Sequence, residues 1–273
     1  MPPVSNAPAF SSPGGIRGAI ESLGASAIRF VLGLGSITGF GGRVLGSVAR
    51  PPYRPRRLVA EIFDTGVLSL PIVCTSGIVV GGVLGLQGYN TLVRFGAEQS
   101  LGAVVGLTLI RELGPVLTAL LVTGRAGSSM AAEIGMMVAT EQIDGMRTMA
   151  VDPVHFVVGP KAMAMTIAMP LLSALFILFA VCGGYLVGVT FLGLDGGIYV
   201  SSLESSVDFR EDVLGSLLKA WVFGLLVALI ATYRGFTSGR STAEVSAATT
   251  GTVVTASVCI LIADYVITAF WGV

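Results

Sequence analysis

A few charged side chains lie inside apolar stretches of the sequence. Arg111 and Glu112 interrupt the run at residues 101–123, and Lys219 is the one charge in the run at residues 213–233. Ionisable residues in such runs are costly, and they usually face a protein interior or a water-filled cavity. Glu112 would balance one of the two cations and leave a net positive charge, which suits a phosphate group. We therefore predict that these three residues line a binding cavity, with a structural ion pair as the alternative.

Enzymatic chemistry has little support in this sequence. A phosphate-binding P-loop needs a lysine between Gly and Ser or Thr, but the only two lysines are Lys161, in Pro-Lys-Ala, and Lys219, in Leu-Lys-Ala. His155 is the only histidine, so a Ser-His-Asp triad and a histidine-rich metal site are both poorly supported. The three cysteines lie far apart in apolar runs and are expected to be core residues. We expect no catalytic residue, metal site or cofactor in this chain.

The segment at residues 127–153 is unusually patterned for a connection. It holds five of the nine methionines and four acids, which together make an adaptable apolar surface with negative charges. We predict a helix over residues 131–150 that docks on a soluble partner; the alternative is a helix that lies against the bilayer. The residues expected to make the contact are Glu133, Met137, Glu141 and Asp144.

The elements that position these residues follow from composition. Hydrophobic residues make up 53% of the chain and charged residues only 12%, about half the share in an average soluble domain. The formal net charge is zero, so no overall field favours a nucleic-acid partner. The sequence therefore predicts an all-α polytopic membrane protein.

Five charge-poor runs approach or exceed the roughly 20 residues that cross a bilayer. The third is longer than a bilayer core requires, so we expect it to tilt, break or re-enter, near Pro170 or Gly183-Gly184. In the first, Gly77, Gly81 and Gly85 repeat every four residues, which predicts close helix packing within a subunit or across a dimer. The runs are residues 66–86, 101–123, 162–194, 213–233 and 245–271.

Orientation follows from the basic residues near the span ends, which are retained in the cytoplasm. They crowd the segment before the first run and the connections after the second and fourth runs, whereas the opposite side holds only Arg94 and Arg210. We predict a cytoplasmic N-terminus and an external C-terminus. On the outer side, Tyr89, Leu92 and Phe95 end the first span and are candidates to flank the apolar part of a ligand.

The N-terminal part of the chain is expected to lie outside the spans. Residues 1–15 are predicted to be disordered, and residues 16–60 to form an interfacial helix and a basic cytoplasmic segment, with a loosely ordered arm as the alternative. The remaining residues, 61–273, are predicted to form the membrane domain.

Several motifs together resemble the signature of MlaE-type permeases, the membrane subunits of bacterial ABC transporters that work with MCE-domain proteins. The resemblance covers roughly residues 60–273 and includes Leu84-Gly85-Leu86-Gln87-Gly88-Tyr89 near the end of the first span. The others are Arg111-Glu112-Leu113-Gly114-Pro115, Gly124-Arg125-Ala126-Gly127, Ala132-Glu133-Ile134-Gly135, Ala139-Thr140-Glu141-Gln142, Met149-Ala150-Val151-Asp152-Pro153, Thr249-Thr250 and Ala263-Asp264-Tyr265.

The resemblance implies a homodimeric permease in the bacterial cytoplasmic membrane that moves phospholipids or related lipids between the inner and outer membranes. Two separate ATPase subunits would bind ATP, and a ring of MCE-domain subunits would lie on the periplasmic side. Residues 127–153 would hold the coupling helix seated in the ATPase, and the predicted cavity would bind lipid.

Two other classes of protein remain as alternatives. A proton- or sodium-coupled secondary carrier would use Glu112 and Asp264 as coupling sites, but no inverted repeat is evident. An intramembrane enzyme would need carboxylate pairs or histidine clusters that the apolar runs lack.

Overall fold

The computed structural model describes residues 35–46 and 55–271. Its residues divide into two units, Met1–Gly42 and Arg43–Val273, and the elements below belong to the second unit. The predictions for residues 1–15 and for the interfacial segment up to residue 34 lie outside the described residues. Residues 35–46 are helical, but nothing in the structure tests whether they lie at a membrane surface.

The prediction of an all-α fold with five spans is confirmed for the described residues. They contain five helical stretches long and apolar enough to cross a membrane and no strand. The stretches are Pro55–Phe95, Glu98–Ala139, Val154–Phe191, Phe209–Phe236 and Thr242–Phe270. They are built from the α-helices α2 (Pro55–Thr65), α3 (Leu70–Leu92), α4 (Leu101–Thr108), α5 (Gly114–Val122), α6 (Ser128–Ala139), α8 (Gly159–Tyr185), α10 (Leu214–Phe236) and α11 (Thr242–Trp271).

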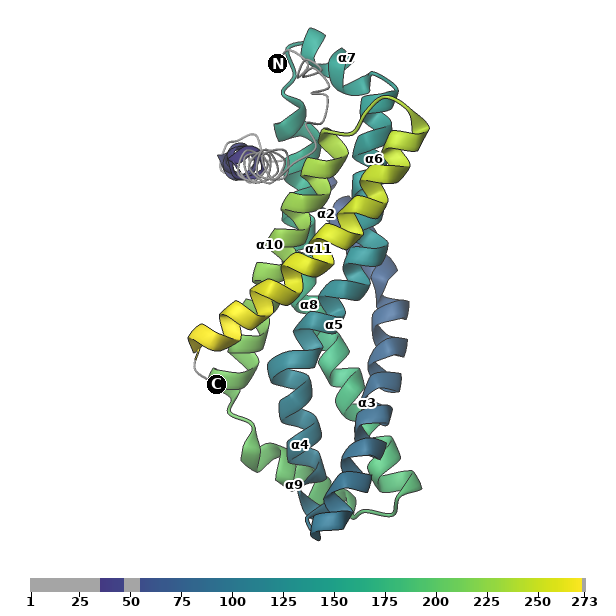
Figure 1. Cartoon of the computed structure of the whole chain (residues 1–273), viewed down its shortest axis with the longest axis vertical. Coiled ribbons are helices and arrows are strands. Elements are labelled where there is room, and N and C mark those ends of the chain that lie inside the picture. The colour runs from purple at the N-terminus through teal and green to yellow at the C-terminus, as the bar shows by residue number, and fades with distance from the viewer. Residues whose placement is uncertain (1–34, 47–54, 272–273) are drawn as a thin grey trace, which may run out of the picture. The chain divides into compact units, whose positions relative to one another are not determined.

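Two short helices and several turns join the spans at their ends. The short helix α7 (Gln142–Thr148) lies at the same end as the turn between α10 and α11, and α9 (Gly196–Ser206) lies at the opposite end (Figure 1). Spans two to four also contain π-helical segments, which frequently occur at functional sites. These are η4 (Leu109–Leu113), η5 (Thr123–Gly127), η6 (Val154–Val158), η7 (Leu186–Phe191) and η8 (Phe209–Val213).

Helix α8 lies at the centre of the bundle, and α3 packs on it through glycines. Gly77, Gly81 and Gly85 are all buried, and a Cβ atom built on Gly81 would lie only 1.8 Å from the carbonyl oxygen of Ala180. From the other side, a Cβ on Gly183 would lie 2.2 Å from the carbonyl oxygen of Ile78. The glycine repeat therefore brings the two backbones together within one subunit, the first of the two predicted uses.

Of the three predicted ways to accommodate the long third span, the structure rules out a break near Pro170, whereas a tilt stays a prediction. Helix α8 is continuous from Gly159 through Pro170 to Tyr185, and the span then proceeds as the π-helical η7 to Phe191. Proline is tolerated inside membrane helices where neighbouring helices and local adjustments satisfy the freed backbone groups. The glycine pair that ends at Gly184 does not interrupt the helix either. Its lack of side chains allows the close approach of α3.

The single helix predicted over residues 131–150 is also wrong. Helix α6 continues the second span to Ala139, and a turn at Thr140 and Glu141 separates it from α7. Glu141 has a φ of 59°, in the left-handed region that non-glycine residues seldom adopt, and such a residue cannot continue a right-handed helix.

Helix α9 closes the end opposite α7. Its Tyr199 is 2% exposed and meets Tyr185 edge to face, with ring centroids 5.5 Å apart. Burial raises the pKa of Tyr199 to about 12. The buried hydroxyl of Tyr199 has no hydrogen-bond partner among the described residues.

Candidate functional site

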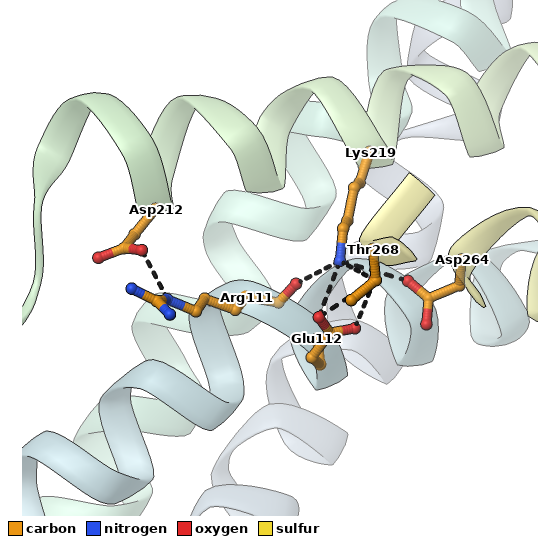
Figure 2. A network of polar contacts seen from close by, with 6 residues as sticks. All are labelled: Arg111, Glu112, Asp212, Lys219, Asp264 and Thr268. Carbon is orange, nitrogen blue, oxygen red and sulfur yellow. Dashed lines mark hydrogen bonds and ion pairs between the residues drawn. The ribbon is translucent and has the colours of Figure 1, made fainter. Parts of the chain in front are cut away.

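The ionisable residues of the second and fourth spans meet in one polar network (Figure 2). Arg111 and Glu112 belong to the π-helical η4, and Lys219 belongs to α10. The network also takes in Asp212 from η8 and two residues of α11, Asp264 and Thr268. Four elements from three different spans therefore converge on one point.

Arg111 is bound by Asp212. Its Nε lies 2.6 Å from Oδ1 of Asp212, whose side chain is only 2% exposed. The second carboxylate oxygen of Asp212 accepts a hydrogen bond of 2.8 Å from the backbone amide of Asp208. Both oxygens of this buried carboxylate are thus used, as a buried charge requires.

Lys219 lies at the centre of the other half of the network. Its Nζ lies 3.0 Å from Oε1 of Glu112, 2.9 Å from the carbonyl oxygen of Arg111 and 2.8 Å from the hydroxyl oxygen of Thr268. A carboxylate oxygen of Asp264 lies farther away, at 3.6 Å. One ammonium group thus ties η4 and α11 to α10.

The charge of the network differs from the expectation. Besides Arg111, Lys219 and Glu112, the network contains the carboxylates of Asp212 and Asp264. Two cations therefore face three carboxylates, for a formal charge of −1, and the predicted net positive charge is wrong. The expectation took in only Arg111, Glu112 and Lys219, whereas Asp212 and Asp264 reach the network from other elements.

The network borders a cavity of about 270 Å³ between η4, η8, α10 and α11. All three predicted charged residues line it, which brings them together as expected, and Lys219 and Glu112 also form the ion pair between spans two and four that the alternative describes. The apolar part of the wall comes from Leu218, Val222, Val266, Ile267 and Phe270. A cavity with one charged side and one apolar side can hold an amphiphilic molecule.

The three apolar or aromatic residues predicted beside the cavity are not part of its lining. Tyr89 and Leu92 end α3 and are partly exposed, and Phe95, in the short helical turn Val93–Phe95, is 79% exposed. The structure thus does not bring them together with Arg111, Glu112 and Lys219. Their predicted contact with acyl chains stays a prediction.

Two members of the network, Asp212 and Thr268, were not predicted from the sequence. Asp264 was named only as a coupling site of the alternative secondary carrier. Asp212 lies seven residues before Lys219, two turns away on the same helical face, and Thr268 lies four residues after Asp264. These spacings were the available signal. These spacings indicate a shared site only when η4 is known to lie beside α10 and α11.

The acids of the predicted docking segment are bound within this chain. Oε2 of Glu133 lies 2.5 Å from Nζ of Lys161, while Arg240 contacts Glu141 at 3.1 Å and Asp144 at 3.0 Å. Met137, the fourth predicted contact, is half-buried on α6. The pairs with Arg240 are exposed and therefore contribute little stability.

Comparison with known proteins identifies the family of this chain. The model of the family described as Permease MlaE matches residues 58–270. The chain is 45% identical to the intermembrane phospholipid transport system permease protein MlaE of Haemophilus influenzae, over 92% of this chain and 96% of that protein.

Two further relatives show the breadth of the similarity. A probable ABC transporter permease protein of Rickettsia felis is 41% identical over 91% of this chain and 95% of its own length. The chloroplastic protein TRIGALACTOSYLDIACYLGLYCEROL 1 of Arabidopsis thaliana is 29% identical over 84% of this chain and 65% of that protein. The five spans, the network within them and these matches lead to one conclusion: the chain belongs to the MlaE permease family, whose members are membrane permeases and not enzymes.

Proposed function

We propose that this chain is the permease subunit of an ATP-driven transporter that moves phospholipids between the inner and outer membranes of a bacterium. The observation that carries the proposal is the cavity beside Arg111, Glu112 and Lys219, in a chain of this family. Its charged wall presents both cations and carboxylates, which suits a zwitterionic headgroup, and its apolar wall suits the start of an acyl chain. The Haemophilus relative is named as a phospholipid permease, which supports the same class of substrate.

The energy for transport comes from separate ATPase subunits in this proposal. Relatives are named as ABC transporter permeases, and neither Lys161 nor Lys219 lies in a P-loop sequence. The coupling segment, residues 127–153, contacts the ATPase through α6 and α7. Besides Glu133, Met137, Glu141 and Asp144, it carries two exposed methionines, Met136 and Met149, which are 47% and 70% exposed.

A second copy of the chain completes the transporter. Helix α11 carries exposed apolar residues at helical spacing along one face, an arrangement that suits packing against an identical helix. Because α11 also borders the cavity, a homodimer through this face would place two cavities close to its axis. The residues of this face are Val254, Val258, Leu261, Ile262 and Tyr265.

In the proposed orientation, α7 faces the cytoplasm, and α9 faces the periplasm and an MCE-domain protein. Basic residues on the α7 side favour this placement. The C-terminus would then be external, so a periplasmic reporter fused after Val273 should be active. Activity of a cytoplasmic reporter at the same point would contradict the orientation.

The transport proposal is tested with the permease and its ATPase subunits reconstituted together in vesicles of phosphatidylethanolamine and phosphatidylglycerol. The amount of fluorescent phosphatidylethanolamine in the vesicles should change when ATP is added. It should stay constant when the ATPase lacks its P-loop lysine. Alanine at Arg111, Glu112 or Lys219 should reduce photo-crosslinked lipid while the complex still assembles.

Two outcomes contradict the proposal. Lipid movement that follows a proton or sodium gradient and ignores ATP would favour the secondary carrier, with Glu112 and Asp264 as coupling groups. Unchanged lipid crosslinking in all three alanine variants, or loss of assembly in all three, would remove the cavity as the lipid site.

A further inference from the structure

The second lysine of the chain also lies among carboxylates, at the end of the bundle that carries α7. Nζ of Lys161, on α8, lies 2.8 Å from Oε2 of Glu61 on α2 and 2.5 Å from Oε2 of Glu133 on α6. Lys161 is 6% exposed as a whole residue. One buried ammonium group therefore joins three helices.

The two carboxylates of this triad differ in their exposure. The side chain of Glu61 is 12% exposed, whereas that of Glu133 is 51% exposed. A buried charge is costly without a partner, so Glu61 and Lys161 depend on each other. Glu133 faces outward, in the segment that we propose to dock on the ATPase.

Helix α2 makes two further contacts at the same end. Arg125, in η5, donates a hydrogen bond to the carbonyl oxygen of Asp64 and lies 3.2 Å from the hydroxyl of Ser69, just after α2. The guanidinium of Arg57, on α2, lies 4.5 Å from the ring centroid of Phe156, in η6.

These contacts fall on both sides of the coupling segment. Arg125 precedes residues 127–153 in the sequence, and Phe156 and Lys161 follow them. Helix α2 therefore contacts the chain just before the segment begins and just after it ends. Within the segment, Glu133 contacts Lys161, the partner of Glu61 on α2. A displacement of Glu133 away from α8 must lengthen its contact with Lys161, which also holds Glu61 of α2.

We propose that Lys161 is a positioning residue, which together with Glu61 on α2 transmits movement of the coupling segment to the membrane-spanning helices. This inference rests on the proposed function, since it takes the segment to be the ATPase contact. It assigns to α2 and Glu61 a part in coupling that neither the charge pattern nor the family match indicates.

The informative variant is Glu61→Gln, because Lys161 keeps its partner Glu133 and the protein should still fold. In the reconstituted complex, we expect ATPase co-purification and basal ATP hydrolysis to stay unchanged. The amount of fluorescent phosphatidylethanolamine moved per ATP hydrolysed should fall by about fivefold or more, at the lower end of typical coupling between sites. Lys161→Arg, which keeps the charge, should retain most of the coupling.

The matched control is Asp64→Asn, which removes a carboxylate from the same helix without touching the triad. It should behave as the unmodified chain. The inference is overturned if Glu61→Gln moves as much lipid per ATP as the unmodified chain. It is equally overturned if Glu61→Gln loses the ATPase, because α2 would then support only assembly. An unmodified complex that moves no lipid with ATP would instead overturn the proposed function itself.

Discussion

Lys219 donates a hydrogen bond of 2.9 Å to the backbone carbonyl oxygen of Arg111. Arg111 lies in the π-helical turn η4, where the regular α-helical hydrogen-bond pattern is interrupted. A buried carbonyl group needs a partner, and here the partner is a side chain from another span. The same ammonium group thus stabilises the irregular backbone and contacts the carboxylate of Glu112 beside it.

Replacing Lys219 with methionine should destabilise the protein. Glu112 and Asp264 would then face one another without the ammonium group between them. Loss of one partner from a fully buried pair costs roughly 3–5 kcal/mol, and we expect roughly 1–3 kcal/mol because Glu112 is partly exposed. Denaturant unfolding in detergent measures the change, and adding Asp264→Asn should recover part of it. An unchanged free energy of unfolding would contradict the role given to Lys219.

Arg111 and Asp212 should show a favourable coupling energy. Their contact is short and Asp212 is almost fully buried. A double-mutant cycle with Arg111→Gln and Asp212→Asn should give about 1–3 kcal/mol of interaction in the free energy of unfolding. Asparagine can still accept from the amide of Asp208, so the cycle isolates the pair. Strictly additive single effects would show that the contact contributes nothing.

Gly81→Ala should disturb the packing of α3 on α8. The new methyl group would meet the backbone of Ala180, which cannot rotate away as a side chain can. We expect a loss of about 1–3 kcal/mol in the free energy of unfolding, the usual cost of overpacking. The control is Gly124→Ala, where nothing lies within 4 Å of the added carbon. Equal stability of both variants would contradict the close approach.

Tyr199→Phe should be neutral or should raise the free energy of unfolding by up to about 1 kcal/mol. The hydroxyl is buried without a hydrogen-bond partner, so its removal eliminates a desolvation cost. Burial raises the pKa of Tyr199 from 10.0 to about 12, because it disfavours the charged phenolate in the folded state. Above about pH 10 the unfolded chain ionises first, so the unmodified chain should lose more stability than the variant between pH 8 and about pH 11.

Charge reversal at Glu141 should weaken ATPase binding while leaving the permease folded. Its contact with Arg240 joins two side chains that are each 66% exposed, so the expected loss of stability is below about 1 kcal/mol. ATPase co-purification measures the docking, and thermal unfolding measures the fold. Arg240→Ala is the control that breaks the same contact but leaves the acid in place. If Glu141→Lys and Glu133→Lys both bind the ATPase and transport lipid normally, these acids are not part of the contact.

The sequence predicted the features that follow from local composition. Five spans, the glycine face of α3 and the approach of Arg111, Glu112 and Lys219 all follow from apolar length, helical spacing and the cost of charge in a membrane. The balance of charge in the network did not follow, because Asp212 and Asp264 come from other elements whose packing no local pattern reveals.

The turn at Glu141 illustrates a different limit. The residues around it have ordinary helix propensity, and the break is a left-handed backbone conformation at one non-glycine residue. Its carboxylate contacts Arg240, which is 99 residues away in the sequence. Local propensity cannot indicate a contact of that range, and the exposed pair contributes too little stability to impose the turn by itself.

The second span has one more mechanical property. From Glu98 to Ala139 it is helical without a loop, so the cavity residue Arg111 and the outward-facing Glu133 belong to a single rod. Twenty-two residues separate them, or about 33 Å at helical rise. The rod contains two π-helical turns, η4 and η5, each of which can shift the helical register by one residue. A twist applied at the end that carries Glu133 would therefore reach the cavity as a rotation of the charged groups, with no loop in between to absorb it.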